Sequence, residues 1–224
     1  MKYRCLILDH DDTVVASEES VNYPCFLEVL DHYRPGEYMD PVEFAQWNFR
    51  MGYADFMRVR YHFTGEELAE EFQMWQDYAA KHIPPAYPGI REVIQEHKRQ
   101  GGILCVASHS GRQIISRDYL THFGLEPDRI FSWDDPRDQR KPLPYPVLQT
   151  MEEFDLRPSD ILVVDDLRAG YDMAKAAGVD FAYAGWGRKN VPEIGEFMKQ
   201  FSKIRFSDPK ELYKLQFDPL TAVL

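Results

Sequence analysis

The chain has 224 residues, 44% of them hydrophobic and 28% charged, which excludes a collagenous, low-complexity or broadly disordered protein. Its 26 Lys and Arg stand against 37 Asp and Glu, and the formal net charge of -11 excludes a protein that neutralises many phosphates along DNA or RNA. No apolar stretch reaches the roughly 18 residues that a membrane-spanning helix needs, and three cysteines do not suit a disulfide framework. We therefore expect a cytoplasmic globular protein with no membrane or nucleic-acid partner.

The first predicted element is a buried strand over the apolar run from Tyr3 to Leu8. No strand pattern follows it before residue 88. Apolar and aromatic residues instead recur at helical spacing in three segments, near residues 18–33, 41–52 and 64–83. Thr64 and Glu67 fit a capping box that marks the start of the third segment. These patterns predict a helical insertion directly after the first strand.

After the insertion, apolar runs and helical patterns alternate. The runs predict strands over residues 103–107, 129–133, 161–164, 181–184 and 203–206. The helical patterns cover residues 88–100, 111–123, 147–154 and 171–177, and a last helix opens at Ser207-Asp208-Pro209. Strands that are apolar throughout and alternate with helices indicate a parallel sheet covered on both faces, so we predict a doubly wound α/β domain.

Acidic and hydroxyl residues follow several predicted strands. Ligands bind beyond the carboxyl ends of the strands in an open parallel sheet, so these side chains are expected to meet in one crevice. The set comprises Asp9, Asp11, Ser108, Asp165 and Asp166, with Lys141 available from a loop before a helix. Four carboxylates would repel unless a cation lay among them, and all-oxygen ligation favours Mg²⁺. The Lys141 ammonium would offset negative charge, and the Ser108 hydroxyl would donate to a phosphoryl oxygen.

Each of these features, taken alone, also fits a structural role. Acidic residues after a strand often form a solvated turn or a helix cap, a serine there often caps a helix, and Lys-Pro is common in loops. Their common order at strand ends favours a functional site. A signalling receiver domain uses similar residues, but its acidic pair would come at the first strand, whereas Asp165-Asp166 here follows Lys141.

Four segments resemble the signatures of the haloacid dehalogenase-like (HAD) superfamily. Leu6 to Thr13 reads LILDHDDT, which is an apolar strand followed by Asp-x-Asp-x-Thr, the first signature. Ser108 after an apolar run resembles the second signature, and Lys141-Pro142-Leu143-Pro144 resembles the third. Ile161 to Asp166, with Ala174 to Gly178 downstream, resembles the fourth. The motifs follow the family's order and span nearly the whole chain.

The resemblance implies both a fold and a chemistry. The fold is α/β, with a Rossmann-like parallel sheet core of residues 1–14 and 88–224 and an all-helical cap domain of residues 15–87. The chemistry is phosphoryl transfer through an aspartyl-phosphate. The dehalogenase and phosphonatase branches lack the second Asp of the first signature, so Asp11 favours the phosphatase branch or a phosphomutase.

The matching positions imply a role for each site residue. Asp9 is implied as the nucleophile and a Mg²⁺ ligand. Asp11 is implied as the general acid and then the general base, with its backbone carbonyl on the metal. Ser108 and the backbone N–H of His109 would hold the phosphoryl oxygens. Lys141 would orient Asp9 and bind the phosphoryl group.

Three positions depart from the common pattern of the family. Asp12 stands where Gly usually follows the second Asp, and Asp165 stands where Gly is common in the fourth signature. Gly170 occupies a place where a further Asp or Asn often lies. Counting back from Gly178 favours Asp166 as the direct Mg²⁺ ligand, with Asp165 either supporting the site without touching the ion or binding it through water. One metal support is therefore missing at residue 170 or supplied by Asp165.

We predict a Mg²⁺-dependent phosphohydrolase that removes phosphate from a small soluble phosphomonoester and is a monomer or small homo-oligomer. A phosphomutase or phosphotransferase of the same fold is one alternative. A catalytically weak member that binds a phosphorylated ligand or a protein partner is another. Basic residues of the helical insertion would either meet a second anionic group of the substrate or lie in solvent, and these are Arg34, Arg50, Arg58, Arg60 and His62.

Overall fold

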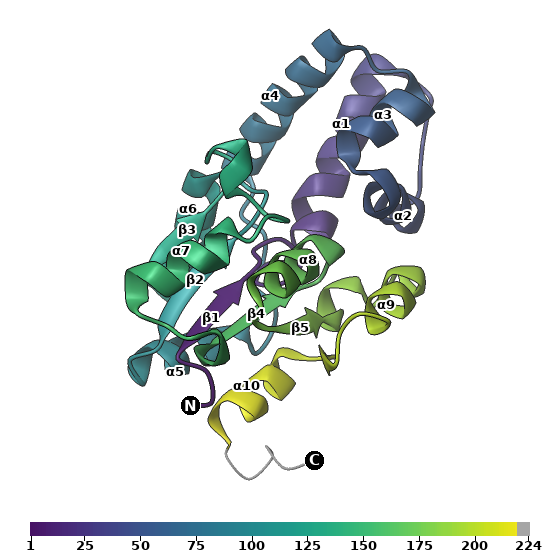
Figure 1. Cartoon of the computed structure of the whole chain (residues 1–224). Helices are drawn as coiled ribbons and strands as arrows, with labels where there is room; N and C mark the ends of the chain where they lie inside the picture. Colours follow the sequence, from purple (N-terminus) through teal and green to yellow (C-terminus); the bar gives the residue numbers. More distant parts are fainter. Residues whose placement is uncertain (219–224) are drawn as a thin grey trace.

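One parallel sheet organises the computed structural model, which describes residues 1–218 (Figure 1). Its six strands are β1 (Cys5–Leu8), β2 (Ile103–Ala107), β3 (Arg129–Phe131), β4 (Ile161–Asp165), β5 (Asp180–Ala184) and β6 (Ile204–Phe206). The order across the sheet is β3-β2-β1-β4-β5-β6, so β1 lies between β2 and β4. The parallel register places Leu8 beside Val106 and Val164. Residues that follow these three strands therefore emerge at the same edge.

Helices cover both faces of the sheet, as the alternating pattern predicts. They are α5 (Ile90–Arg99), α6 (Arg112–Phe123), α7 (Tyr145–Phe154), α8 (Arg168–Ala177), α9 (Pro192–Lys199) and α10 (Pro209–Phe217). Alternate residues of β1 point to opposite faces, so Leu6 and Leu8 pack with α5, α6 and α10. Cys5 and Ile7 pack with α7, α8 and α9 on the other face. The α/β prediction is confirmed.

Some element boundaries differ from the prediction. The strand predicted over residues 129–133 ends at Phe131, because a turn follows in which the Asp135 N–H donates to the Ser132 carbonyl. The helix predicted over residues 171–177 begins at Arg168. Helix α9 was not predicted, since it has only eight residues and contains a glycine at position 195.

The segment between β1 and α5 is helical, as expected. It contains a π-helical turn, η1 (Glu18–Asn22), followed by α1 (Tyr23–Tyr33), α2 (Pro41–Met51), α3 (Tyr53–Tyr61) and α4 (Gly65–Lys81). The capping box at the start of α4 is confirmed, since the Glu67 N–H donates to the Thr64 hydroxyl and the Thr64 N–H donates to the Glu67 carboxylate. Helix α3 was not predicted as a separate helix. A single residue, Gly52 at φ 80°, separates it from α2.

This helical segment has a hydrophobic cluster of its own. Phe26, Phe44 and Phe56 form its centre, with the Phe26 and Phe44 rings 4.6 Å apart between centroids. The chain leaves and re-enters the sheet domain side by side, because the Ala16 N–H donates to the Pro85 carbonyl and the Tyr87 N–H donates to the Val14 carbonyl. These features support the division into a core and a cap at residues 14/15 and 87/88, which we retain as a proposal.

A second contact joins the helical segment to the sheet domain through α2 and α9. The Phe49 and Phe197 rings meet edge to face at 5.1 Å between centroids. Beside them, Arg50 binds both carboxylate oxygens of Glu193 at 3.0 Å. The helical segment therefore contacts the sheet domain both at the connection near residues 14–16 and through α2.

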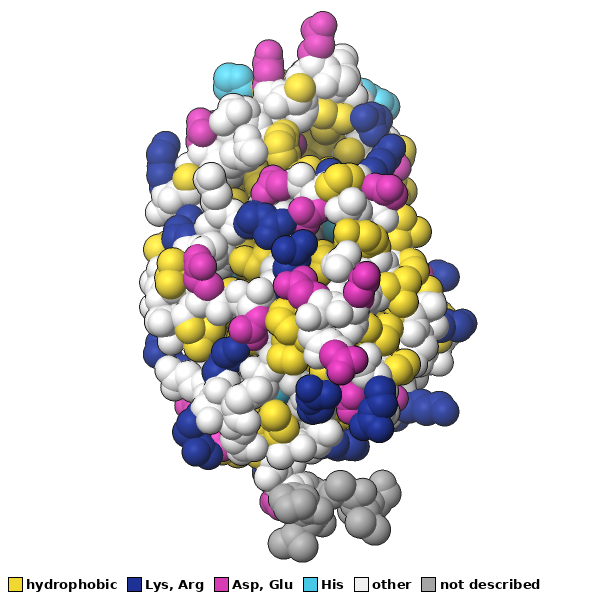
Figure 2. Space-filling model, turned by 60° about the vertical axis from the view of Figure 1, so that its left-hand side comes forward, with side chains coloured by type: hydrophobic (Ala, Val, Ile, Leu, Met, Phe, Trp, Pro, Cys, Tyr) yellow, Lys and Arg dark blue, Asp and Glu magenta, His cyan; other side chains and the backbone are white. Residues whose placement is uncertain are grey.

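The surface mixes charges of both signs. On the face that Figure 2 draws, Lys and Arg side chains alternate with Asp and Glu and with small hydrophobic groups. This view shows no extended basic patch over the described residues, in keeping with the net charge of -11. Within residues 1–218, no helix combines the length and the apolar character that crossing a bilayer requires.

A buried carboxyl group in the helical segment gives a pH-dependent prediction. Glu71 on α4 is 6% exposed, and burial raises its pKa from 4.5 to about 7 against a smaller opposing effect of the Tyr53 hydroxyl. Because its pKa is higher in the folded chain than in the unfolded chain, Glu71 costs stability above pH 4.5, and fully so above pH 7. Glu71→Gln is expected to raise the free energy of unfolding by roughly 3 kcal/mol at pH 8 and hardly at all at pH 4.

Urea unfolding at both pH values measures the effect. Glu66→Gln, an exposed position on the same helix, is the matched control and is expected to change little at either pH. A gain for Glu71→Gln that is the same at pH 4 and pH 8 would show that titration of Glu71 is not its source.

Candidate active site

Three carboxylates from two neighbouring strands meet at the carboxyl edge of the sheet. Asp9 directly follows β1, and its backbone N–H donates to the Val164 carbonyl of β4. Asp165 ends β4 and Asp166 follows it. Each of the three residues offers a carboxylate oxygen, and these oxygens lie within 4.8 Å of one another. All three side chains are buried, so the structure brings together the acidic residues that the sequence placed at these strand ends.

Lys141 lies between two of these carboxylates. Its Nζ is 2.8 Å from Asp9 Oδ1 and 2.8 Å from Asp165 Oδ2. Burial opposes the ammonium charge, but Asp165 and Asp9 outweigh it and raise the pKa of Lys141. The backbone of the loop that carries Lys141 is held in place, because the Lys141 carbonyl accepts a hydrogen bond of 2.9 Å from the His109 ring. Lys141 is therefore charged and held against Asp9.

Asp11 faces the serines that follow β2. Its Oδ2 accepts from the Ser110 hydroxyl at 2.6 Å and from the Ser108 hydroxyl at 3.2 Å. Burial disfavours the carboxylate, but His10, Ser110 and Ser17 outweigh that effect and hold the pKa of Asp11 below its ordinary value. In this arrangement Asp11 is ionised. Ser110 was not predicted as a site residue, although it belongs to the polar cluster at the end of the predicted strand.

Arg188 is a site residue that the sequence analysis missed. Its guanidinium contacts Asp166 at 2.6 Å, Glu18 at 2.5 Å and Asp12 at 3.3 Å, and it is 8% exposed. These contacts tie the end of β4 to the turn after β1 and to the first helical turn of the insertion. Its position shortly after the strand predicted over residues 181–184 was the available signal, since that strand ends at the same edge.

The departure at Asp12 has a structural explanation. Asp12 adopts φ 54°, a left-handed conformation in which glycine is the usual residue. Its carboxyl group is buried against Arg188. The backbone packs so closely here that a Cβ on Gly187 would lie 1.8 Å from the Asp12 carbonyl oxygen. Asp12 therefore belongs to the ion-pair network of Arg188, and Gly187 is required beside it.

The departure at Gly170 is explained by Asp165. A Cβ at residue 170 would lie 2.3 Å from the Asp165 Cβ and Oδ2. The Asp165 carboxylate accepts from Lys141 through Oδ2 and from the Leu167 N–H through Oδ1, so it is fixed in that position. Residue 170 has no room for a side chain while Asp165 is present, and Asp165 places a carboxylate in the space in front of it.

A buried network anchors the loop of Asp9 and Asp11. His10 lies between them in sequence and contacts Asp118 Oδ2 through Nε2 at 3.1 Å. Arg117 pairs with the other Asp118 oxygen at 2.7 Å. Arg117 also donates to the Ala79 carbonyl near the end of α4 at 2.6 Å. These residues were not predicted to have a role, and their network connects the loop of Asp9 and Asp11 to the helical insertion.

The donor set fits a hard divalent cation. Burial raises the pKa of Asp165 to about 8 and of Asp166 to about 7, because their charges are clustered and largely removed from water. Among the described residues, Asp166 Oδ1 is buried and has no hydrogen-bond partner. A buried acceptor without a donor is costly unless a cation or water binds it. Oxygen ligands from Asp9, Asp165 and Asp166 suit Mg²⁺.

The four arginines of the insertion pair with carboxylates outside the cluster around Asp9. Arg34 pairs with Glu67, Arg50 with Glu193, Arg58 with Asp55 and Arg60 with Glu37. The His62 carbonyl accepts from Arg34. In the structure these contacts are with carboxylates or backbone, and none is with the cluster around Asp9.

Comparison with known proteins gives consistent matches. Residues 6–184 match the family described as haloacid dehalogenase-like hydrolase. A pyrophosphatase PpaX from Bacillus cereus (strain Q1) is 22% identical over 211 residues, which cover 93% of this chain and 95% of the relative. A putative phosphoglycolate phosphatase from Lactobacillus plantarum superposes with TM-score 0.71 at 24% identity, covering 96% of this chain and 100% of that one. CbbY from Rhodobacter sphaeroides, solved with phosphate, gives TM-score 0.71 at 19% identity, covering 94% and 96%. At these identities the structural matches establish the fold.

Proposed function

This chain belongs to the haloacid dehalogenase-like hydrolase family, and we propose that it is a Mg²⁺-dependent phosphohydrolase that acts on a small soluble phosphomonoester. One observation carries the proposal. Asp9 lies in a buried cluster with Asp165 and Asp166, and the Lys141 ammonium is 2.8 Å from it. A carboxylate held in this way suits nucleophilic attack on a phosphate that has been partly neutralised. The names of the relatives, a pyrophosphatase and a putative phosphoglycolate phosphatase, support a small phosphorylated substrate, and the second of them names a phosphomonoester.

Asp9 would be the nucleophile. Its Oδ1 is occupied by Lys141 and by the His10 N–H at 2.7 Å. We assign the attack to Oδ2, which would form a bond to phosphorus as the bond from phosphorus to the leaving oxygen breaks. Water would then attack the phosphorus of the aspartyl-phosphate, releasing inorganic phosphate and restoring the Asp9 carboxylate.

Asp11 would transfer the protons. It would protonate the leaving oxygen in the first step and accept a proton from water in the second. Its lowered pKa in the free enzyme suits the second step. In the first step, an incoming phosphate would draw the Ser108 hydroxyl away from Asp11 and bring negative charge close to it. Both changes would raise the pKa of Asp11 toward the value that a general acid needs.

The phosphoryl oxygens would be held by Ser108, the backbone N–H of His109 and Lys141. The Ser108 hydroxyl lies at the end of β2, next to the Asp11 carboxylate. The fixed Lys141 ammonium stabilises negative charge on both Asp9 and a transferring phosphoryl group. Because the Lys141 ammonium is held in place before substrate arrives, it needs little reorganisation during reaction, whereas the Ser108 hydroxyl would turn from Asp11 to the phosphate.

Mg²⁺ would be held by the side chains of Asp9, Asp166 and Asp165 and by the backbone carbonyl of Asp11. When bound, the ion supplies positive charge that screens phosphate from the carboxylates. A cytoplasmic location and a monomeric or small homo-oligomeric state belong to the same proposal. The reduced and buried thiols of Cys5, Cys25 and Cys105 support that location.

Chelation tests the metal requirement. Removal of divalent ions with EDTA is expected to reduce hydrolysis of a generic aryl phosphate to background, and added Mg²⁺ should restore it. Mg²⁺ should also raise the melting temperature of the wild type, because it binds only the folded cluster. That rise should disappear in Asp166→Asn. It should persist in Asp172→Asn, a control that changes the partner of Arg168 in an ion pair on α8. Full activity in the presence of EDTA would refute the metal assignment.

A screen of phosphorylated metabolites, with and without Mg²⁺, tests the activity itself. Turnover of one or more small phosphomonoesters supports the proposal, and release of free phosphate distinguishes hydrolysis from a mutase reaction. Saturable binding of phosphorylated compounds without any turnover would instead identify a catalytically weak member.

A further inference from the structure

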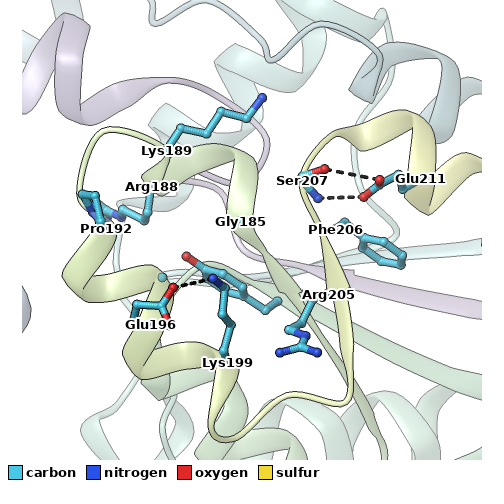
Figure 3. A pocket seen from close by; sticks show the side chains of 12 residues that line it. Gly185, Arg188, Lys189, Pro192, Glu196, Lys199, Arg205, Phe206, Ser207 and Glu211 are labelled. Carbon is cyan, nitrogen blue, oxygen red and sulfur yellow. Dashed lines mark hydrogen bonds and ion pairs between the residues drawn. The ribbon is translucent and has the colours of Figure 1, made fainter.

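A cavity lies at the same edge of the sheet, beyond β5 and β6. It has a volume of about 410 Å³, which is in the range of small-molecule sites. Figure 3 shows it between α9 with the loop after β5 on one side and β6 with Ser207 on the other. Of the proposed catalytic residues, none lines it. The cavity is therefore separate from the cluster around Asp9, although Arg188 reaches both.

The wall of the cavity contains more basic side chains than acidic ones, and the acidic side chains already have partners. Its charged residues are Arg188, Lys189, Lys199, Arg205, Glu196 and Glu211. The Glu196 carboxylate pairs with Lys199 at 2.5 Å. The Glu211 carboxylate accepts from the Ser207 N–H at 2.7 Å and from its hydroxyl at 3.2 Å. Both acidic groups are thus already engaged.

Two of the cations remain available. Within residues 1–218, Lys189 and Arg205 form no ion pair or side-chain hydrogen bond. Figure 3 shows Arg205 on β6, with its guanidinium toward α9, and Lys189 on the opposite side of the opening, with its side chain extended outward at the rim. Tyr183, which is buried, adds a phenol to the wall. The available groups are thus hydrogen-bond donors, and a ligand that only accepts hydrogen bonds complements them.

We propose that this cavity binds a small phosphate-bearing anion between Arg205 and Lys189. A guanidinium offers a planar fork that matches two phosphate oxygens, and the Lys189 ammonium supplies a second, flexible point charge. Such an anion could come from two sources. One is inorganic phosphate released by hydrolysis, and the other is a phosphorylated metabolite that is not being hydrolysed. This proposal does not depend on turnover at Asp9.

Nuclear magnetic resonance on the intact protein tests the proposal at the cavity itself. The backbone amides of Gly185 and Gly195, both in the cavity wall, are the reporters. Titration with inorganic phosphate at millimolar concentration is expected to shift them saturably. The double variant with Lys189→Gln and Arg205→Gln loses two charged donors. It should bind phosphate at least about tenfold more weakly in the same titration. Arg91→Gln/Lys203→Gln removes the same charge at exposed positions outside the cavity and should respond like the wild type.

A second titration distinguishes the two sources of phosphate. Phenylphosphonate presents a phosphate-like group on an organic body and cannot be hydrolysed at its carbon–phosphorus bond. A stronger response to inorganic phosphate identifies the released product as the ligand, and a stronger response to phenylphosphonate identifies a phosphorylated metabolite. Reporter amides that stay unmoved by both compounds, or that move equally in Lys189→Gln/Arg205→Gln, would overturn the proposal. Neither result would bear on hydrolysis at Asp9, which the chelation assay measures separately.

Discussion

Asp9→Asn is expected to lower the turnover of a phosphomonoester by at least about three orders of magnitude, because an amide cannot accept the phosphoryl group. The change is nearly isosteric. Asn still offers an oxygen to the Lys141 ammonium and to the His10 N–H, which both contact Asp9 Oδ1 in the wild type. Steady-state rates with an aryl phosphate and Mg²⁺ measure the loss.

The control for Asp9→Asn separates lost chemistry from lost structure. Asp160→Asn changes another buried carboxyl group just before β4, at the opposite end of that strand from Asp165, and is expected to retain activity. Circular dichroism and thermal unfolding should show that Asp9→Asn remains folded. If a folded Asp9→Asn variant hydrolyses substrate at a rate near that of the wild type, Asp9 is not the nucleophile.

Asp11→Asn is expected to lower turnover of an alkyl phosphate by about 10² to 10⁴-fold, the usual contribution of a general acid. The loss should depend on the leaving group. An alkoxide needs a proton to depart, whereas a nitrophenolate is stable without one. The variant should therefore retain far more of its wild-type rate on p-nitrophenyl phosphate than on an alkyl phosphate. Comparison of kcat for the two substrates measures the difference.

Ser110→Ala provides the matched control for Asp11. It removes the hydroxyl that donates to Asp11 Oδ2 at 2.6 Å but keeps the carboxyl group. Its loss of activity should be much smaller than that of Asp11→Asn and similar for both substrates. A loss in Asp11→Asn of no more than about threefold, or an equal loss on both substrates, would exclude proton transfer by Asp11.

The fold was predictable because its signals are local. Continuous apolar runs such as 161–164 and their spacing by helical patterns depend on nearby residues alone. The rule that ligands bind beyond the carboxyl ends of parallel strands then brought Asp9 and Asp166 together from distant parts of the chain. The structure confirms this proximity.

The residues that were missed act through contacts that the sequence does not display. Arg188 follows β5, but its three carboxylate partners come from three separate segments. Nothing in the sequence around His10 indicates its role. That role depends on a contact with Asp118, which lies more than a hundred positions away in the chain. The conflict between Asp165 and a side chain at residue 170 is likewise a matter of packed distances. These features require coordinates.

Hydrolysis through an aspartyl-phosphate requires that Asp9 becomes esterified during turnover. Acid quenching of the enzyme in the steady state with substrate and Mg²⁺, followed by borohydride reduction, converts an aspartyl-phosphate to homoserine. Peptide mass spectrometry then locates the modified residue. We predict homoserine at position 9 and none at position 11. Enzyme treated without substrate should contain no homoserine at either position. Homoserine at a different residue, or no homoserine under conditions in which the phosphorylated enzyme accumulates, would show that Asp9 is not the nucleophile.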